Sequence, residues 1–197
     1  MKITKIETSI SDHVMPGLIA LRIHTDEGFI GNGESYYAPH AVAAMTHDWM
    51  SRSLLGANPL DVEKHWRFLY ERAANFGARG CELRALSAID LALWDIIGQA
   101  AGQPVWQILG GKTQDSLAIY NSSGGATYGA RGTAHADPQG WPGHGDVGEK
   151  APLNDYWSLV NEPEAYIDSL LDEGYQAFKC WPLAFAAHKP GGPRHIS

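Results

Sequence analysis

The sequence predicts an α+β domain, made of a three-stranded antiparallel meander and several helices, followed by the start of a parallel β/α arrangement. Three observations predict this fold class. Three segments near the N-terminus alternate apolar and polar residues, a long helical pattern follows them, and the remaining chain contains a strand, a helix and a second strand in that order.

The meander is predicted from the alternation over residues 2–10, 17–25 and 29–37. In the first strand, residues 3, 5 and 7 are expected on one face and residues 4, 6 and 8 on the other. The acidic pair and glycine at 26–28 supply a turn between the second and third strands. Gly31 and Gly33 mark either a bulge or a point where another backbone approaches the third strand closely.

Helical spacing predicts helices over residues 39–55 and 60–73, and a third, mostly buried helix within the stretch 85–111. The third helix carries an apolar stripe with small residues beside it, which would let another element approach. The stripe is Leu86, Ile89, Leu93 and Ile96, and the small residues are Ala85, Ala88 and Ala92. Glu82 is expected in the first turn, Gly102 and Pro104 end the helix, and the apolar segment 105–109 is expected to pack after it.

Composition and charge argue against several classes of protein. The chain has 197 residues, 44% hydrophobic and 19% charged, and a formal net charge of -7, so we expect neither a nucleic-acid partner nor an anionic membrane surface. No apolar run reaches the roughly 18 residues of a membrane span, and the first ten residues lack the apolar core of a signal peptide. Cys81 and Cys180 are isolated in the sequence, which predicts reduced thiols in a cytoplasmic protein.

The C-terminal part of the chain predicts a strand over residues 117–120, a helix over 164–172 and a strand over 177–181. Two strands joined through a helix form a parallel unit. Residues 126–160 are rich in glycine and proline and show no periodicity, so we expect a long loop there.

The long helical stretch also resembles a known family. It reads ALSAIDLALWDIIGQ over residues 85–99, followed by PV at 104–105 and LGG at 109–111. This pattern is similar to the signature of the mandelate racemase/muconate lactonizing enzyme branch of the enolase superfamily. One departure is Ile108, where the pattern usually has leucine, and that exchange conserves volume.

The resemblance implies a capping domain over residues 1–114 and the beginning of a (β/α)8 barrel over residues 115–197. Such a barrel takes about 250 residues, with about 200 as a lower limit. The 83 residues that follow residue 114 are enough for about two of its eight units. We therefore expect an intact capping domain joined to an incomplete barrel, prone to association through its open sheet edges.

Lys179 is the predicted catalytic residue. Alternation places Ala177, Lys179 and Trp181 on one strand face, and burial of that face in a barrel would lower the lysine pKa toward that of a base. From the sequence alone, a single lysine in a strand is more often a surface charge. The resemblance favours function, because relatives carry Lys-x-Lys here, but Trp181 replaces the second lysine. Lys179 is then expected to steady a substrate carboxylate or oxyanion, with Trp181 shaping the pocket.

Five positions in two loops are candidates for substrate binding, and each also has the plain interpretation of an exposed turn residue. In relatives, the loops over residues 11–17 and 36–40 fold over the barrel mouth and determine substrate choice. The predicted substrate-binding residues of the loops are His13, Tyr36, Tyr37 and His40, with Met15 as a further candidate. Asn121, at the end of the first barrel strand, completes the set.

Other motifs carry little weight. The repeated His-x-Asp at His135/Asp137 and His144/Asp146 offers metal ligands, but its loop supplies nothing to orient them, so a solvated loop is favoured. Asp90 and Asp95 lie five residues apart on a helix, about 140° apart around its axis, and are interpreted as structural. A phosphate loop ending at Lys112 is rejected, because its first glycine would fall on Trp106.

The resemblance implies a Mg²⁺-dependent acid-sugar dehydratase that removes the proton α to a carboxylate, with a small acid sugar as its partner. The metal ligands are expected beyond residue 197, so no metal ligand is assigned and the fragment is expected to be inactive alone. The full-length protein is expected to be a homo-oligomer. The alternatives are a racemase or epimerase of the same superfamily, and a non-catalytic remnant that serves as a binding or oligomerisation module. A reading frame continuing for about 200 residues after Ser197, with acidic residues closing successive strands, would favour the enzyme.

Overall fold

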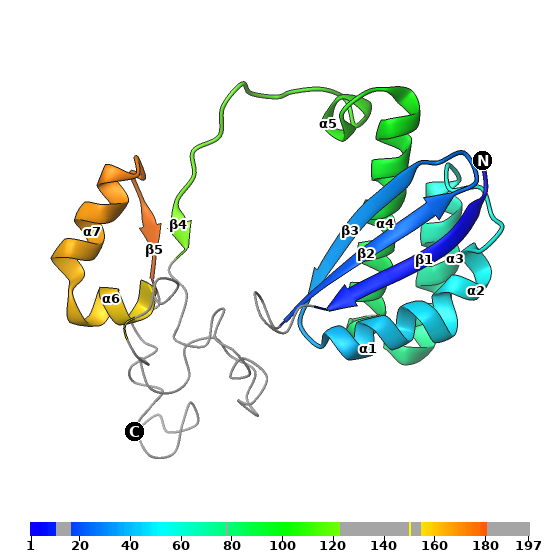
Figure 1. The fold of residues 1–197 in the computed structure, drawn as a ribbon, viewed down its shortest axis with the longest axis horizontal. Helices are drawn as coiled ribbons and strands as arrows, with labels where there is room; N and C mark the ends of the chain where they lie inside the picture. The colour runs from blue at the N-terminus through cyan, green and yellow to red at the C-terminus, as the bar shows by residue number, and fades with distance from the viewer. Residues whose placement is uncertain (11–16, 78, 123–149, 151–154, 181–197) are drawn as a thin grey trace, which may run out of the picture. The chain divides into compact units, whose positions relative to one another are not determined.

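The N-terminal part of the chain forms an antiparallel sheet of three strands, β1 (Ile3–Ile10), β2 (Leu18–Thr25) and β3 (Ile30–Tyr36), in the order β1-β2-β3 (Figure 1). The computed structural model describes residues 1–10, 17–77, 79–122, 150 and 155–180. These described residues divide into two compact units, with the boundary between Thr113 and Gln114. The predicted meander is confirmed.

The alternation predicted for β1 is wrong at its start. Ile3 and Ile6 are both buried, although they are three residues apart and should lie on opposite faces of a regular strand. The pairing of β1 with β2 shifts register between Ile3 and Lys5, as in a β-bulge. The extra residue brings both isoleucines to the core face, which simple alternation could not predict.

Helices cover one face of this sheet (Figure 1). The predicted helix over 39–55 is three helical segments in succession: α1 (Pro39–Ala44), a π-helical stretch (Met45–Met50) and α2 (Ser51–Leu54). It is followed by α3 (Val62–Ala73), a 3₁₀ turn (Ala74–Phe76), α4 (Cys81–Ala101) and the single turn α5 (Val105–Ile108). The helix α4 begins around Glu82 and ends where Gly102 takes a left-handed conformation at φ 62°, as the sequence predicts.

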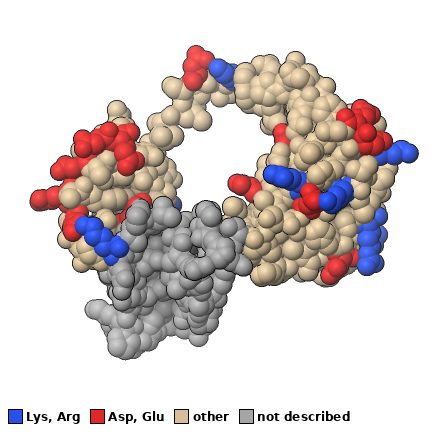
Figure 2. All heavy atoms as spheres, in the orientation of Figure 1, with Lys and Arg blue, Asp and Glu red and all other residues tan. Residues whose placement is uncertain are grey.

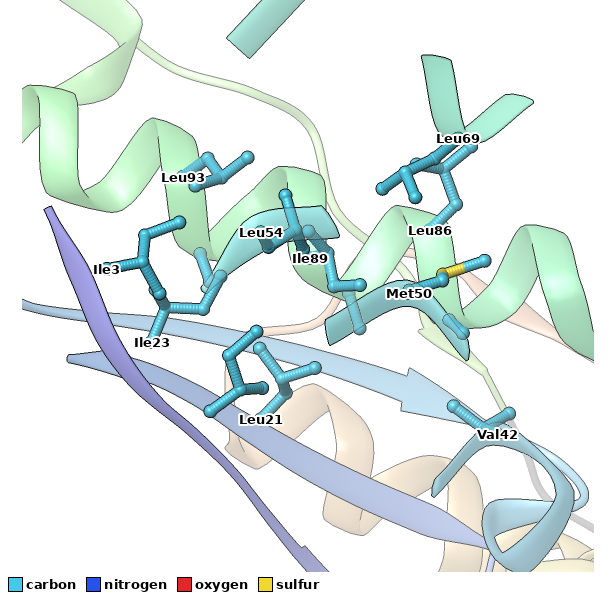
Figure 3. Packing of buried hydrophobic residues seen from close by; sticks show 14 of the residues in the cluster. Ile3, Leu21, Ile23, Val42, Met50, Leu54, Leu69, Leu86, Ile89 and Leu93 are labelled. Atoms are coloured by element: carbon cyan, nitrogen blue, oxygen red, sulfur yellow. The ribbon is translucent and has the colours of Figure 1, made fainter. Parts of the chain in front are cut away.

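The core of this unit lies between the sheet and the helices. Figure 3 shows Leu21 and Ile23 of the sheet facing Leu86, Ile89 and Leu93 of α4. The apolar stripe predicted for α4 is buried along its whole length. The segment after α4 packs only in part as predicted. Val105 lies close to Gly98 of α4, whereas Trp106 and Leu109 are exposed.

Strand β3 packs directly on the backbone of α4. A Cβ atom added to Gly31 would lie 2.0 Å from the carbonyl oxygen of Ala92, and one added to Gly33 would lie 1.9 Å from that of Ala88. The pairing of β2 with β3 has no register shift, so these glycines serve close approach and not a bulge. Small residues on both elements make this contact possible.

Polar side chains of α4 also hydrogen-bond the free edge of β3. Asp95 accepts from the backbone N–H of Asn32 at 2.8 Å and from its side-chain amide at 3.0 Å. Gln99 donates to the carbonyl oxygen of Ile30 at 2.7 Å, and Arg84 donates to that of Tyr36 at 2.6 Å. These bonds satisfy backbone groups that an edge strand would otherwise present to water or to another chain.

The second unit contains a parallel pair of two-residue strands, β4 (Asn121–Ser122) and β5 (Phe178–Lys179), with helices α6 (Asp155–Asn161) and α7 (Pro163–Asp172) between them in the chain. The predicted parallel unit is confirmed, but the strand predicted over 117–120 is wrong. Those residues are irregular and exposed, and the strand begins only at Asn121, where β5 supplies a partner.

Helix α7 is amphipathic. Tyr166 and Leu170, four residues apart, are buried, whereas Glu164, Asp168 and Asp172 are exposed. Figure 2 shows acidic side chains gathered on the visible surface of the second unit, while both signs of charge are interspersed on the first. Among the described helices, none is long and apolar enough to cross a membrane.

Candidate functional site

The corner between β3 and α1 contains the substrate-loop residues predicted from the sequence. Tyr37 and Ala38 have φ angles of 70° and 47°, in the left-handed region that residues with a side chain avoid. Such a conformation costs about 1–2 kcal/mol per residue and persists only where surrounding contacts enforce it. Two such residues in succession mark this corner as a place where the backbone is held.

Within the described residues, three contacts tie the corner to other parts of the chain, and one more lies within it. The Tyr37 N–H donates to the carbonyl oxygen of Gly17 at 2.9 Å, and Arg84 Nη1 donates to the carbonyl oxygen of Tyr36. The Arg84 guanidinium also lies over the Tyr37 ring, with Cζ 5.1 Å from the ring centroid. The rings of Tyr36 and Tyr37 meet edge to face at 4.5 Å.

Gly17, the last residue of the predicted loop over residues 11–17, lies against this corner. A Cβ atom at this position would lie 2.7 Å from the Tyr36 ring, so the ring occupies the space that any other side chain would need. Gly17 directly follows residues 11–16, and the described ends of both predicted loops therefore lie side by side. His40 is exposed on α1, while His13 and Met15 lie outside the described residues.

In the second unit, the parallel register places Lys179 beside Ser122 and Phe178 beside Asn121. The carboxyl ends of the two strands therefore meet at one edge, which is the edge that carries active sites in β/α barrels. Lys179 is exposed in this structure, and Trp181 lies outside the described residues. The His-x-Asp motifs of the long loop also lie outside them.

Asn121 and Lys179 occupy opposite faces of the strand pair. The hydroxyl of Tyr166 on α7 donates to Asn121 Oδ1 at 3.0 Å, so the Asn121 side chain points toward the helix. Since alternate residues point to opposite faces, Lys179 and Ser122 share the face away from α7. Ser122 was not predicted, because the register that brings it beside Lys179 cannot be obtained from the order of residues in the chain.

The two aspartates of α4 have different environments. Burial acts to raise the pKa of Asp95, but hydrogen bonds from the Asn32 backbone and side chain and from Gln99 outweigh it, so the pKa lies below its usual value. Burial, with a smaller contribution from the charge of Glu63, raises the pKa of Asp90. The edge contacts of Asp95 agree with the structural interpretation of that residue.

No group of three or more His, Cys, Asp or Glu side chains that could hold a metal ion occurs within the described parts of the chain. These residues therefore do not fit the Mg²⁺ that the resemblance implies.

The described residues thus form an antiparallel sheet covered by helices and, later in the chain, a parallel strand pair. The family model for the N-terminal domain of mandelate racemase/muconate lactonizing enzymes matches residues 2–110. The chain belongs to this family, within the enolase superfamily.

Similar proteins include two dehydratases. A D-galactonate dehydratase of Pectobacterium atrosepticum is 40% identical over 127 residues, which cover 64% of this chain and 32% of the relative. A D-mannonate dehydratase of Novosphingobium aromaticivorans is 33% identical over 130 residues, which cover 64% of this chain and 31% of the relative. The chain thus spans about a third of the length of these curated relatives.

A solved structure extends the similarity over both units. The crystal structure of an enolase of the mandelate racemase subgroup from Agrobacterium tumefaciens has a TM-score of 0.66 and 28% identity. The match covers 95% of this chain and 40% of that chain. The prediction of a capping domain with a partial barrel is confirmed.

Proposed function

We propose that this chain is the capping domain, residues 1–114, and the first barrel units, residues 115–197, of an acid-sugar dehydratase. The observation that carries the proposal is the 33–40% identity with D-mannonate and D-galactonate dehydratases over some two thirds of the chain. The substrate is then a polyhydroxy carboxylic acid.

The reaction removes the proton at the carbon α to the carboxylate and expels hydroxide from the β carbon. The resulting enol becomes a 2-keto-3-deoxy acid. In this scheme Lys179 steadies the carboxylate or the developing oxyanion, because a cation at that point stabilises charge that grows in the transition state. Ser122, on the same strand face, supplies a hydroxyl for the substrate.

The capping unit contributes substrate choice. Tyr36, Tyr37 and His40 lie at or directly after the strained corner, and tyrosine and histidine side chains offer both stacking surface and hydrogen bonds to a polyol. Asn121 has a weaker role in substrate binding, because its side-chain oxygen already accepts a hydrogen bond from the Tyr166 hydroxyl. We also propose that His13 and Trp181 bind substrate. The protein is further proposed to be cytoplasmic and homo-oligomeric, with Mg²⁺ as its cofactor.

The test uses a polypeptide with a complete barrel, either the continued reading frame or residues 1–113 fused to the barrel of the Pectobacterium relative. It is incubated with D-galactonate, D-mannonate and other sugar acids in the presence of Mg²⁺, and 2-keto acid formation is measured. We expect dehydration of at least one sugar acid. Formation of an epimer without 2-keto acid would favour a racemase or epimerase, and no turnover of any sugar acid would favour the non-catalytic module.

The role of Lys179 is tested in a polypeptide with a complete barrel that retains residues 115–197. Lys179→Ala is expected to lower kcat by about 10²–10³-fold, the usual cost of removing a group that stabilises an oxyanion. Lys64→Ala, on the exposed surface of α3, is the matched control and should retain activity. Retained activity in Lys179→Ala would remove this lysine from the mechanism.

A further inference from the structure

We infer that Arg84 is a positioning residue that holds residues 36–40 in the conformation that meets substrate. This inference rests on the proposed function, in which that segment contributes to substrate choice. It names a residue outside the segment, on the first turns of α4, that neither the sequence signature nor the similarity to dehydratases assigns.

The backbone of the corner needs stabilising contacts from residues outside it. Tyr37 and Ala38 both adopt a left-handed backbone, and neither is a glycine. The segment would relax toward ordinary backbone angles if its contacts were removed, and the side chains of Tyr36, Tyr37 and His40 would change direction with it.

Arg84 makes two of the three contacts described above. Its guanidinium donates to the Tyr36 carbonyl oxygen at 2.6 Å, which is short and charge-assisted, and it lies over the Tyr37 ring. The planar group can donate the hydrogen bond and lie over the ring at once, whereas a lysine ammonium is a single point charge that would make both contacts less well. The third contact, from Gly17, uses backbone atoms and cannot be changed by altering a side chain.

The Arg84 side chain is not part of the hydrophobic core. It is exposed, while the next two residues of α4, Ala85 and Leu86, are buried. Its substitution should therefore alter the corner and leave the packing of α4 on the sheet intact.

The first test follows amide hydrogen exchange by NMR in the 197-residue chain, without any substrate. Arg84→Gln is expected to raise the exchange rate of the Tyr37 amide about tenfold, because a charge-assisted hydrogen bond that holds the corner is lost. The exchange rate of the Ile89 amide in α4 should not change. Arg84→Lys should give a smaller increase and carries the test if Arg84→Gln fails to fold. Arg67→Gln is the matched control, because Arg67 is exposed on α3 and pairs only at 4.0 Å with Glu63.

The second test measures kinetics in the complete-barrel polypeptide used to test the proposed function. Arg84→Gln is expected to raise KM about fivefold or more with little change in kcat, and Arg84→Lys to recover part of the loss. Unchanged Tyr37 exchange would overturn the role of Arg84 whatever the enzyme does. Faster Tyr37 exchange with an unchanged KM would show that residues 36–40 do not meet substrate, and would overturn the inference on that ground. Absence of all turnover would be a failure of the proposed function and not of this inference.

Discussion

The two units of this chain differ in how much of their apolar surface they bury. In the capping unit, Leu21, Ile23, Ile89 and Leu93 have at most 1% of their surface exposed, and they belong to one continuous core. In the second unit, the described residues include two buried apolar side chains, Tyr166 and Leu170. Leu117 and Ile119 there are 72% and 68% exposed.

This difference shows which stretch of the sequence can bury its own apolar surface without the other. The capping unit contains both partners of its main contact, the sheet and α4, so its burial is complete within about 110 residues. The strands of the second unit have two residues each, and parallel strands are normally buried on both faces by further elements. We therefore expect stability to reside in the capping unit.

The largest effect is expected from Ile89→Ala. Ile89 is fully buried between α4 and the sheet, and its truncation should lower the free energy of unfolding by about 3–4 kcal/mol. Urea unfolding followed by far-ultraviolet circular dichroism measures the change. Leu170→Ala, in α7, is the comparison and should leave this transition in place; an equal loss in both variants would mean that the two units unfold together.

The next effect is expected from Gly33→Ala. The new methyl group would lie 1.9 Å from the Ala88 carbonyl oxygen, so β3 and α4 must separate, at a cost of about 2–3 kcal/mol. Thermal unfolding of the variant measures the loss. Glu34→Ala, at the next and exposed position of β3, serves as the control, and a Gly33→Ala chain as stable as this control would contradict the close packing.

A smaller, pH-dependent effect is expected from Glu82→Gln. The N–H groups of Gly80 and of Glu82 itself lower the pKa of this carboxyl, against the effect of burial, and the Arg79 N–H contributes further. Because the folded-state pKa is depressed, the carboxylate stabilises the fold above its ordinary pKa of 4.5, and that stabilisation is lost as pH falls through the folded pKa.

At pH 7 the Glu82→Gln variant should therefore be less stable by about 1 kcal/mol, and the gap should close as pH falls from 4.5 through the lowered folded pKa. Denaturant unfolding over a pH series measures it, with Glu71→Gln on the exposed face of α3 as the control. A gap that stays constant with pH would rule out the charge as its cause.

The smallest effect is expected from Asp90→Asn, and it has the opposite sign. Burial and the nearby charge of Glu63 raise the pKa of Asp90, so its ionised form destabilises the folded state at pH 7. The variant should be more stable there by about 0.5 kcal/mol, and the advantage should vanish as pH falls through the raised pKa toward 3.8. Loss of stability at pH 7 in thermal unfolding would show that the Asp90 carboxylate makes a favourable contact.

Local patterns in the sequence predict most of the capping unit. The strand ends, the buried stripe of α4 and its stop at Gly102 agree with the structure because they depend on periodicity and local backbone preference. The β1 bulge and the π-helical stretch Met45–Met50 could not be predicted, since both are set by tertiary packing. Gly31 and Gly33 could be singled out, but only the structure distinguishes close approach from a bulge.

The candidate site was less predictable. The positions of Tyr36 and Tyr37 at a loop could be inferred, but the left-handed corner and its contact with Arg84, 47 residues after Tyr37 in the chain, are products of the fold. The register of β4 with β5 separates Asn121 from Lys179 and brings in Ser122, which no spacing in the sequence indicates.

Residues 1–113 should fold without the rest of the chain, because both partners of their main contact lie within them. The most direct test is urea unfolding of this segment alone beside the 197-residue chain. We predict one cooperative transition in the segment, with a free energy of unfolding within about 1 kcal/mol of that measured for the capping unit in the longer chain. A segment that unfolds without cooperativity, or is several kcal/mol less stable, would contradict the claim.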